Sequence, residues 1–318
     1  MVMTKPPATK FPLATKKDIR DAYTDKISEV TDKIATYFGD GYTLVPNFEA
    51  IYPYAEAKDY GTSIGSAAFR YFESVVTYGK NLTDEGANDD AKSVLAEVIP
   101  TKTIKLVAEE DDKASYTGVR VNDEGELEIY FREDSFYSNT DYCCENIAQA
   151  IDEALFKKTP TALPLVTRKD LRDNWLAKKT DLEKELAEEL NDTPFTLHFD
   201  AAAAWEALVA AWTALPKKKK SEIDLEAAKQ NLGYCAYEYF SGLKSTISYR
   251  FGDDELMIEG FLEAVDKKEA HLVVVQELSD GRTYNDCVIE GETLLIRTVP
   301  GNWGVNTNDA CEKLVELL

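Results

Sequence analysis

The chain has 318 residues, with 36 Lys and Arg against 58 Asp and Glu, and a formal net charge of −22. Its hydrophobic content of 44% is typical of folded proteins and too high for intrinsic disorder, and its length suffices for two domains with separate cores. The excess of acid argues against direct binding to nucleic acid or to an anionic membrane, because those surfaces are bound through Lys and Arg.

The N-terminal sequence and the cysteines bear on the compartment. Residues 1–17 contain no apolar run long enough for a signal peptide, and the longest apolar stretch, residues 201–212, is too short to span a bilayer. The five cysteines form no Cys-x-x-Cys pair, which fits reduced thiols. We therefore expect a soluble, cytoplasmic protein.

The first half of the chain begins with helical patterns. Apolar residues recur at steps of three and four over residues 18–38, and a Gly-Asp-Gly sequence ends this helix. A short strand or extended connector is predicted at residues 42–45. Helices at residues 63–78 and 90–98 follow.

The pattern then changes to the alternation that is typical of strands. Residues 103–108, 116–121 and 126–131 are short runs rich in β-branched and aromatic residues, separated by turn sequences. They predict a three-stranded antiparallel meander. A closing helix at residues 141–155 completes this half, and residues 156–164 form a linker.

The second half repeats this order. The twelve residues that start at Pro12 align with the twelve that start at Pro164, an offset of 164 − 12 = 152, and seven of the twelve pairs are identical. The later counterparts, in chain order, are a strand at 195–199, helices at 225–243 and 254–265, strands at 271–277, 283–289 and 293–298, and a closing helix at 309–318. We predict an α+β fold of two tandem related modules, residues 1–160 and 161–318, that arose by internal duplication.

The charge divides evenly between the two modules. Residues 1–160 contain 18 basic and 29 acidic residues, and the remainder contain 36 − 18 = 18 and 58 − 29 = 29, so each half carries 18 − 29 = −11. The excess of acidic residues is therefore a property of each module. Its simplest explanation is a solvated surface that keeps the protein dispersed.

One motif resembles the nucleophile elbow of hydrolases. The residues from Gly61 to Gly65 read Gly-x-Ser-x-Gly, with Ser63 at the nucleophile position. The segment before it is polar, both histidines lie in the other half, and the repeat places Asn231 at the position of the serine. Close packing of a helix over the glycine is therefore the favoured interpretation, and catalysis by Ser63 stays an alternative.

Histidines and carboxylates provide no clear metal site in the sequence. His198 and His271, the two histidines, lie in alternating or apolar segments, where core or edge histidines are more common than ligands. Acidic clusters such as residues 109–112 lack the spacing of a calcium loop, and no phosphate-binding glycine-rich loop follows a strand. We predict no metal and no cofactor.

Aromatic residues outside the periodic patterns are the remaining candidates for a binding surface. Tyrosine suits interfaces because it buries a large area and keeps a polar tip, although covering the core of a loop-rich module explains these residues equally well. The candidates are Tyr52, Tyr54, Tyr60, Phe136, Tyr137 and Tyr142.

The lack of a catalytic constellation and the repeated module favour a non-catalytic structural or protein-interaction protein, a scaffold that binds a protein partner or copies of itself. The charge suggests an alternative, an acidic mimic of nucleic acid that inhibits a DNA- or RNA-binding protein. The third hypothesis is an enzyme, either a hydrolase that uses Ser63 or a carboxylate–metal enzyme.

Overall fold

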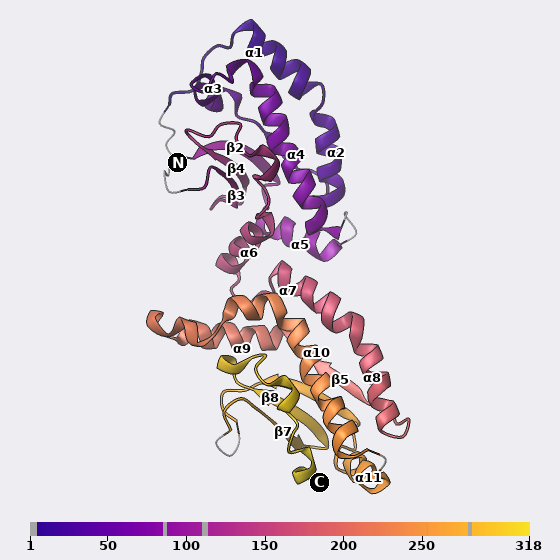
Figure 1. The fold of residues 1–318 in the computed structure, drawn as a ribbon. Coiled ribbons are helices and arrows are strands. Elements are labelled where there is room, and N and C mark those ends of the chain that lie inside the picture. Colours follow the sequence, from indigo (N-terminus) through magenta and orange to yellow (C-terminus); the bar gives the residue numbers. More distant parts are fainter. Residues whose placement is uncertain (1–4, 85–87, 110–113, 253, 279–281) are drawn as a thin grey trace. The chain divides into compact units, whose positions relative to one another are not determined.

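The computed structural model describes residues 5–84, 88–109, 114–252, 254–278 and 282–318 (Figure 1). The chain divides into two compact units, Met1–Lys158 and Thr159–Leu318. Each unit combines helices with one four-stranded sheet, so the α+β class is confirmed. In the described residues, no helix is both long enough and apolar enough to cross a membrane.

The first unit starts with a long helical segment where the sequence predicted one helix. This segment begins as α1 (Leu13–Asp18), passes through a π-helical turn (Ile19–Thr24) and continues as α2 (Ile27–Phe38), which ends at Gly39 with a φ of +97°. The other helices of this unit are α3 (Phe48–Glu56), α4 (Ile64–Leu82), α5 (Asp89–Val98) and α6 (Ile147–Lys158). A 3-10 turn, Thr140–Tyr142, replaces the start of the predicted closing helix.

The sheet of the first unit does not have the predicted topology. Its strands are β1 (Thr43–Val45), β2 (Thr103–Glu109), β3 (Thr117–Val121) and β4 (Leu127–Arg132), in the order β1-β2-β4-β3. Residues 122–125 do join β3 and β4 in an antiparallel pair, but β2 runs parallel to both β1 and β4. The predicted antiparallel meander is therefore wrong. The physical reason is that β2 is buried on both of its faces, with Leu106 at 0% exposure and Val107 at 5%, which suits a central parallel strand.

The second unit repeats this architecture. Its elements are α7 (Leu165–Asp170), a π-helical turn (Leu171–Leu176), α8 (Ala177–Glu189), β5 (Thr196–Phe199), α9 (Ala201–Ala214), α10 (Leu225–Arg250), α11 (Glu255–Ala264), β6 (Glu269–Val274), β7 (Asn285–Glu290) and β8 (Thr293–Thr298). The strand order is β5-β6-β8-β7, and again only the last pair is antiparallel, so the meander prediction is wrong here too. The closing helix predicted at 309–318 is also wrong, because short 3-10 turns occupy this segment.

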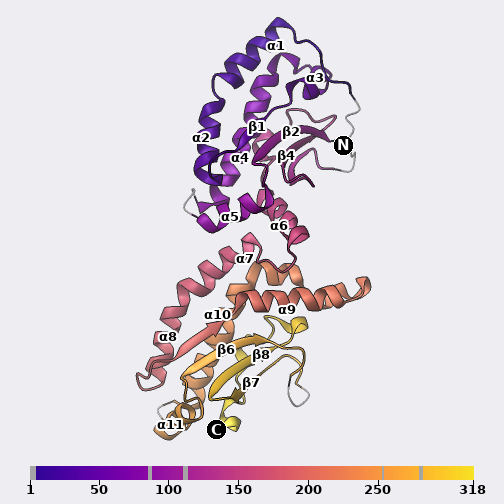
Figure 2. The same cartoon turned by 180° about the vertical axis from the view of Figure 1, so that it is seen from behind.

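Helices cover one face of each sheet. In both views of the first unit, α2 and α4 lie on the same side of the strands (Figures 1 and 2). Tyr71 of α4 is fully buried, with its ring centroid 6.1 Å from that of Phe131 on β4. This face of the sheet is the core of the unit.

In each unit, an aspartate at the end of the first helix, α1 or α7, accepts a hydrogen bond from a glycine N–H of the longest helix, α4 or α10. A carboxylate oxygen of Asp18 accepts from the N–H of Gly65 at 2.6 Å, and Asp170 accepts from the N–H of Gly233 in the same way. A Cβ at Gly65 would lie 2.6 Å from the carbonyl oxygen of Asp18, and one at Gly233 would lie 2.7 Å from that of Asp170. Both positions therefore require glycine.

The two sheets can be aligned residue by residue. Lys102 and Lys268 both have positive φ, 50° and 55°, immediately before β2 and β6. The carbonyl of Lys102 accepts from the N–H of Thr43 at 2.8 Å, and that of Lys268 accepts from Thr196 at 2.9 Å. This shared junction makes each residue of β2 equivalent to the residue 166 positions later in β6.

Candidate functional site

The candidate site in the first unit lies on the free side of its edge strand, β3, whose five residues are all half-buried. Among the described strands, β3 pairs only with β4. Residues of an antiparallel pair alternate between those that bond to the partner strand and those whose backbone groups point away. The N–H of Arg132 donates to the carbonyl of Tyr116, and the N–H of Asn122 donates to that of Glu126, so Tyr116 and Asn122 face β4. The outward-facing residues of β3 are therefore Thr117, Val119 and Val121.

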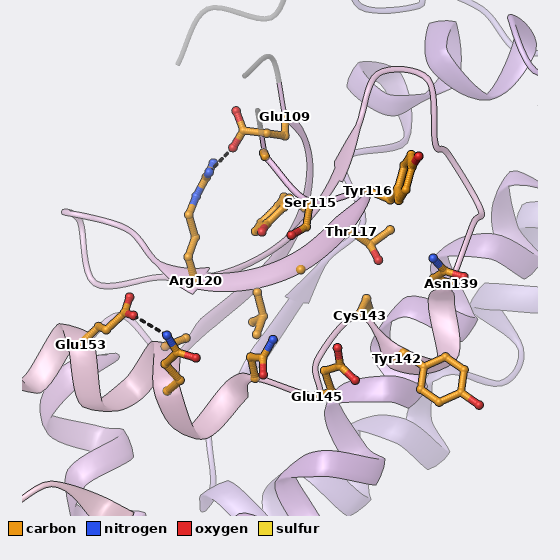
Figure 3. Close-up of a pocket in the computed structure, with 17 residues that line it drawn as sticks. Glu109, Ser115, Tyr116, Thr117, Arg120, Asn139, Tyr142, Cys143, Glu145 and Glu153 are labelled. Carbon is orange, nitrogen blue, oxygen red and sulfur yellow. Dashed lines mark hydrogen bonds and ion pairs between the residues drawn. The ribbon is translucent and has the colours of Figure 1, made fainter. Parts of the chain in front are cut away.

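A groove runs beside this strand. Residues 114–120 form one wall, and the opposite wall consists of residues between Asn139 and Glu153, which include the first part of α6 (Figure 3). The volume of the groove is about 700 Å³, within the range of ligand-binding clefts. Helix α6 packs against β3 and also against α4 and α5, which fixes the second wall to the core.

The lining of the groove is acidic. Its charged residues are Glu109, Glu145 and Glu153 on the negative side and Arg120 on the positive side. Arg120 is hydrogen-bonded to Glu109 and, at 2.8 Å, to Glu128, and these bonds raise its pKa although burial acts in the opposite direction. The guanidinium is thus committed to carboxylates of its own sheet, and the exposed Glu145 and Glu153 set the sign of the groove.

Polar and aromatic side chains complete the walls. The carboxamides of Asn139, Asn146 and Gln149 line the helical side, where they can donate to and accept from a peptide backbone. Tyr116 and Tyr142 are 57% and 63% exposed and lie toward the same end of the groove (Figure 3). Exposed tyrosines of this kind give a binding surface apolar area with a polar tip.

The second unit has a smaller groove at the equivalent edge. It lies beside β7, has a volume of about 350 Å³, and its charged lining consists of Arg282, Lys313, Asp309 and Glu312. Asn285 of β7 crosses this groove, because its carboxamide donates to the carbonyls of Val305 and Asn306. Thr117, which pairs with Phe131 as Asn285 pairs with Thr298, is the corresponding residue of the first unit.

The six predicted aromatic residues separate into core and surface. Tyr52, Tyr54 and Phe136 are buried, with exposures of 6%, 1% and 1%. Tyr60 is 41% exposed, and its ring meets that of Tyr137 edge to face at a centroid distance of 5.3 Å. Tyr142 is the member of this set that lines the groove.

The structure places Ser63 outside the context of a nucleophile elbow. A helix, α3, and a 3-10 turn precede α4 here, whereas the elbow joins a strand to a helix. The glycine that follows, Gly65, is explained by the close approach of Asp18 described above. The recurrence of glycine at Gly233, without the serine, has the same cause.

The structure brings together one group of chemistry-bearing residues that the sequence alone does not indicate. In the described part of the chain, one group of His, Cys, Asp and Glu residues has the spacing of metal ligands: His198, Glu269 and His271 of the second unit. The two histidines are 73 positions apart, 271 − 198, and only the parallel pairing of β5 with β6 brings them together.

Comparison of the chain with protein-family models, with curated proteins and with solved structures found no match. The geometry of these sites is therefore the basis for inferring a function.

Proposed function

We propose that this is a non-catalytic protein-interaction protein, and that the groove beside β3 binds an extended segment of a partner protein that contains Lys or Arg. The observation that carries this proposal is the position of the outward-facing residues of β3. Their N–H and C=O groups point away from β4, and across the groove stand the side chains of α6.

An edge strand next to a helix-walled groove suits the addition of another strand. In this mode of recognition the main-chain hydrogen bonds supply affinity, and alternate side chains of the bound segment supply specificity. The five residues of β3 extend over about 17 Å at the rise of a strand. A bound segment of about five residues therefore matches the length of the wall.

Charge complementarity defines the chemistry of the segment. The groove contains three carboxylates and one guanidinium, in a half of the chain with a net charge of 18 − 29 = −11. The net negative charge of the unit attracts a segment that contains Lys or Arg over a distance. In the groove, the carboxylates of Glu145 and Glu153 can pair with that segment, because the one cation of the lining, Arg120, is bonded to other carboxylates.

The proposal is tested with two labelled heptapeptides, one alternating Lys and Val and the other alternating Glu and Val. Fluorescence anisotropy with the full chain should show saturable binding of the basic peptide and at least tenfold weaker binding of the acidic one. Equal affinity for both peptides, or no binding by either, would contradict the proposal.

A variant separates backbone pairing from general attraction. Val119→Pro removes one N–H that faces the groove and leaves the hydrogen bonds to β4 in place, which is why proline is tolerated on edge strands. We expect at least tenfold weaker binding of the basic peptide by Val119→Pro and a change within twofold for Val119→Ala, with far-ultraviolet circular dichroism of both variants like that of the parent chain. Unchanged affinity in Val119→Pro would exclude strand addition.

The acidic nucleic-acid mimic makes a different prediction. If total charge drove association, Glu124→Lys on the exposed β3–β4 turn would weaken binding of the basic peptide as much as Glu145→Lys in the groove. Strand addition in the groove predicts a clearly larger effect of Glu145→Lys. The two charge-matched variants therefore discriminate between the two functions.

A further inference from the structure

Two neighbouring strands of the second unit present the two histidines of the chain on one face. In the parallel pair of β5 and β6, His198 stands opposite His271. Glu269 lies two residues before His271 on the same strand, and side chains two apart point to the same face. The ring centroids of the two histidines are 4.5 Å apart.

The distances among these side chains match those of a coordination sphere. Nε2 of His198 is 3.5 Å from Oε2 of Glu269, and Nε2 of His271 is 3.5 Å from Oε1. Metal–ligand bonds of about 2.1 Å in tetrahedral geometry place the ligand atoms roughly 3.4 Å from one another. The ligand atoms of the three residues all lie within 4.8 Å of one another, so small rotations complete the set.

One ligand atom lacks a hydrogen-bond partner. Nε2 of His271 is buried and makes no hydrogen bond of normal geometry, since Oε1 of Glu269 lies 3.5 Å away, and a buried polar atom in this state is uncommon in folded proteins. A cation at this point would satisfy the nitrogen. The rings of His198 and His271 are nevertheless 43% and 36% exposed overall, which provides a path for an ion to enter.

The surroundings also hold the carboxylate in place. The hydroxyl of Thr293 donates to Oε1 of Glu269 at 2.9 Å. Partners of this kind orient metal ligands.

We propose that His198, Glu269 and His271 bind one divalent transition-metal ion through two imidazole nitrogens and one carboxylate, with a further coordination position open to solvent. Two imidazoles and a carboxylate suit Zn²⁺, Co²⁺ or Fe²⁺, and three protein ligands with an open position are typical of reactive rather than purely structural metal sites. Mg²⁺ and Ca²⁺ require a sphere of six or more oxygens, which this set does not supply.

The first unit provides an internal comparison. The residues equivalent to His198, Glu269 and His271 are Val45, Thr103 and Lys105. Lys105 is a cation and forms ion pairs with Glu126 and Glu128. The donor set is thus present in one unit, so we expect one ion per chain.

Isothermal titration calorimetry of the full chain with Zn²⁺, under reducing conditions, is the test. We expect one ion per chain, and at least 100-fold weaker binding by Glu269→Gln and by His271→Phe. Thr293→Val, which removes the hydrogen bond to the carboxylate, should weaken binding about tenfold. Mg²⁺ should not compete at a hundredfold excess.

A thiol variant identifies any competing site. Cys235 is the partly exposed cysteine of the second unit, and Cys235→Ser should bind Zn²⁺ as the parent chain does. Unfolding temperatures without metal show whether each variant is folded, and Glu269→Gln preserves the size of the side chain. Full-strength binding in Glu269→Gln and His271→Phe, loss of binding in Cys235→Ser, or no heat of binding in the parent chain would overturn the proposal.

Discussion

At the outer edge of the sheet, the first unit has Thr117 where the second has Asn285, and the two grooves differ accordingly. Asn285 donates across its groove to the carbonyls of Val305 and Asn306, and about 350 Å³ remains. Beside Thr117 the groove measures about 700 Å³. The charged lining is 1 − 3 = −2 in the first unit and 2 − 2 = 0 in the second. The same strand order thus supports an open acidic groove in one unit and a small, balanced one in the other.

On the inner strands, the second unit has the residues that could bind a ligand, and the first unit does not. The first unit fills the face of β1 and β2 with Val45 and the ion-paired Lys105, whereas the second unit places two histidines at these positions. The repeated backbone thus places side chains at equivalent positions in the two units, and a few substitutions give these positions different chemistry.

The largest effect should be a loss of stability when the glycine contact that both units share is disrupted. Gly65→Ala and Gly233→Ala each place a methyl group against backbone atoms of a neighbouring helix at 2.6–2.7 Å, and overpacking of this kind costs about 3 kcal/mol. Urea unfolding of the full chain measures this loss. The matched control, Ser63→Ala, should change the free energy of unfolding by less than about 0.5 kcal/mol, and an equal loss in the control would contradict the assignment.

The next effect comes from giving the second unit the inner-strand residues of the first. The double variant Glu269→Thr and His271→Lys removes two of the three ligands and adds a positive charge at the proposed ion position. We expect the affinity for Zn²⁺ to fall more than 100-fold, measured by calorimetry. Retention of the affinity would place the ion elsewhere.

A smaller effect should follow from copying the closed groove into the first unit. Thr117→Asn introduces the carboxamide that crosses the groove in the second unit. Affinity for the alternating Lys and Val heptapeptide should fall about tenfold in anisotropy titrations, whereas Thr117→Ser should stay within twofold. Equal affinities in the two variants would show that this position does not control access.

The smallest effect concerns the charge of the open groove. Glu145→Lys reverses one exposed carboxylate of the lining, and we expect roughly threefold weaker binding of the basic peptide, because exposed charges contribute modestly. The dependence of affinity on salt should also become less steep. An affinity that exceeds that of the parent chain would contradict an acidic recognition surface.

Local patterns in the sequence predicted the elements better than their pairing. The strands at 103–108 and 126–131 appear in the structure within one residue, because alternation and β-branching are local signals. The turn at residues 122–125 correctly indicated the β3–β4 hairpin, but nothing local fixes the parallel pairing of β2 with β1 and β4. The uninterrupted apolar run Leu106-Val107-Ala108 was the available signal for a central strand, and the structure buries all three residues.

The candidate sites were less predictable for the same reason. Tyr142 was predicted as a binding residue and lines the groove, but Tyr52, Tyr54 and Phe136 belong to the core. Clusters of aromatic residues occur both in cores and on binding surfaces, so the sequence could not separate these residues. The meeting of His198 with His271 depends on a strand register between distant segments. Their positions in two predicted strands of the same half were the available signal.

The most direct test of the central claim, that the free edge of β3 pairs with an extended basic segment, is residue-resolved amide hydrogen exchange of the full chain with and without the Lys and Val heptapeptide. We expect new protection at Thr117, Val119 and Val121 and little change at Gly118 and Arg120, whose amides already face β4. Protection that is uniform along β3, or that appears instead along β7, would contradict it.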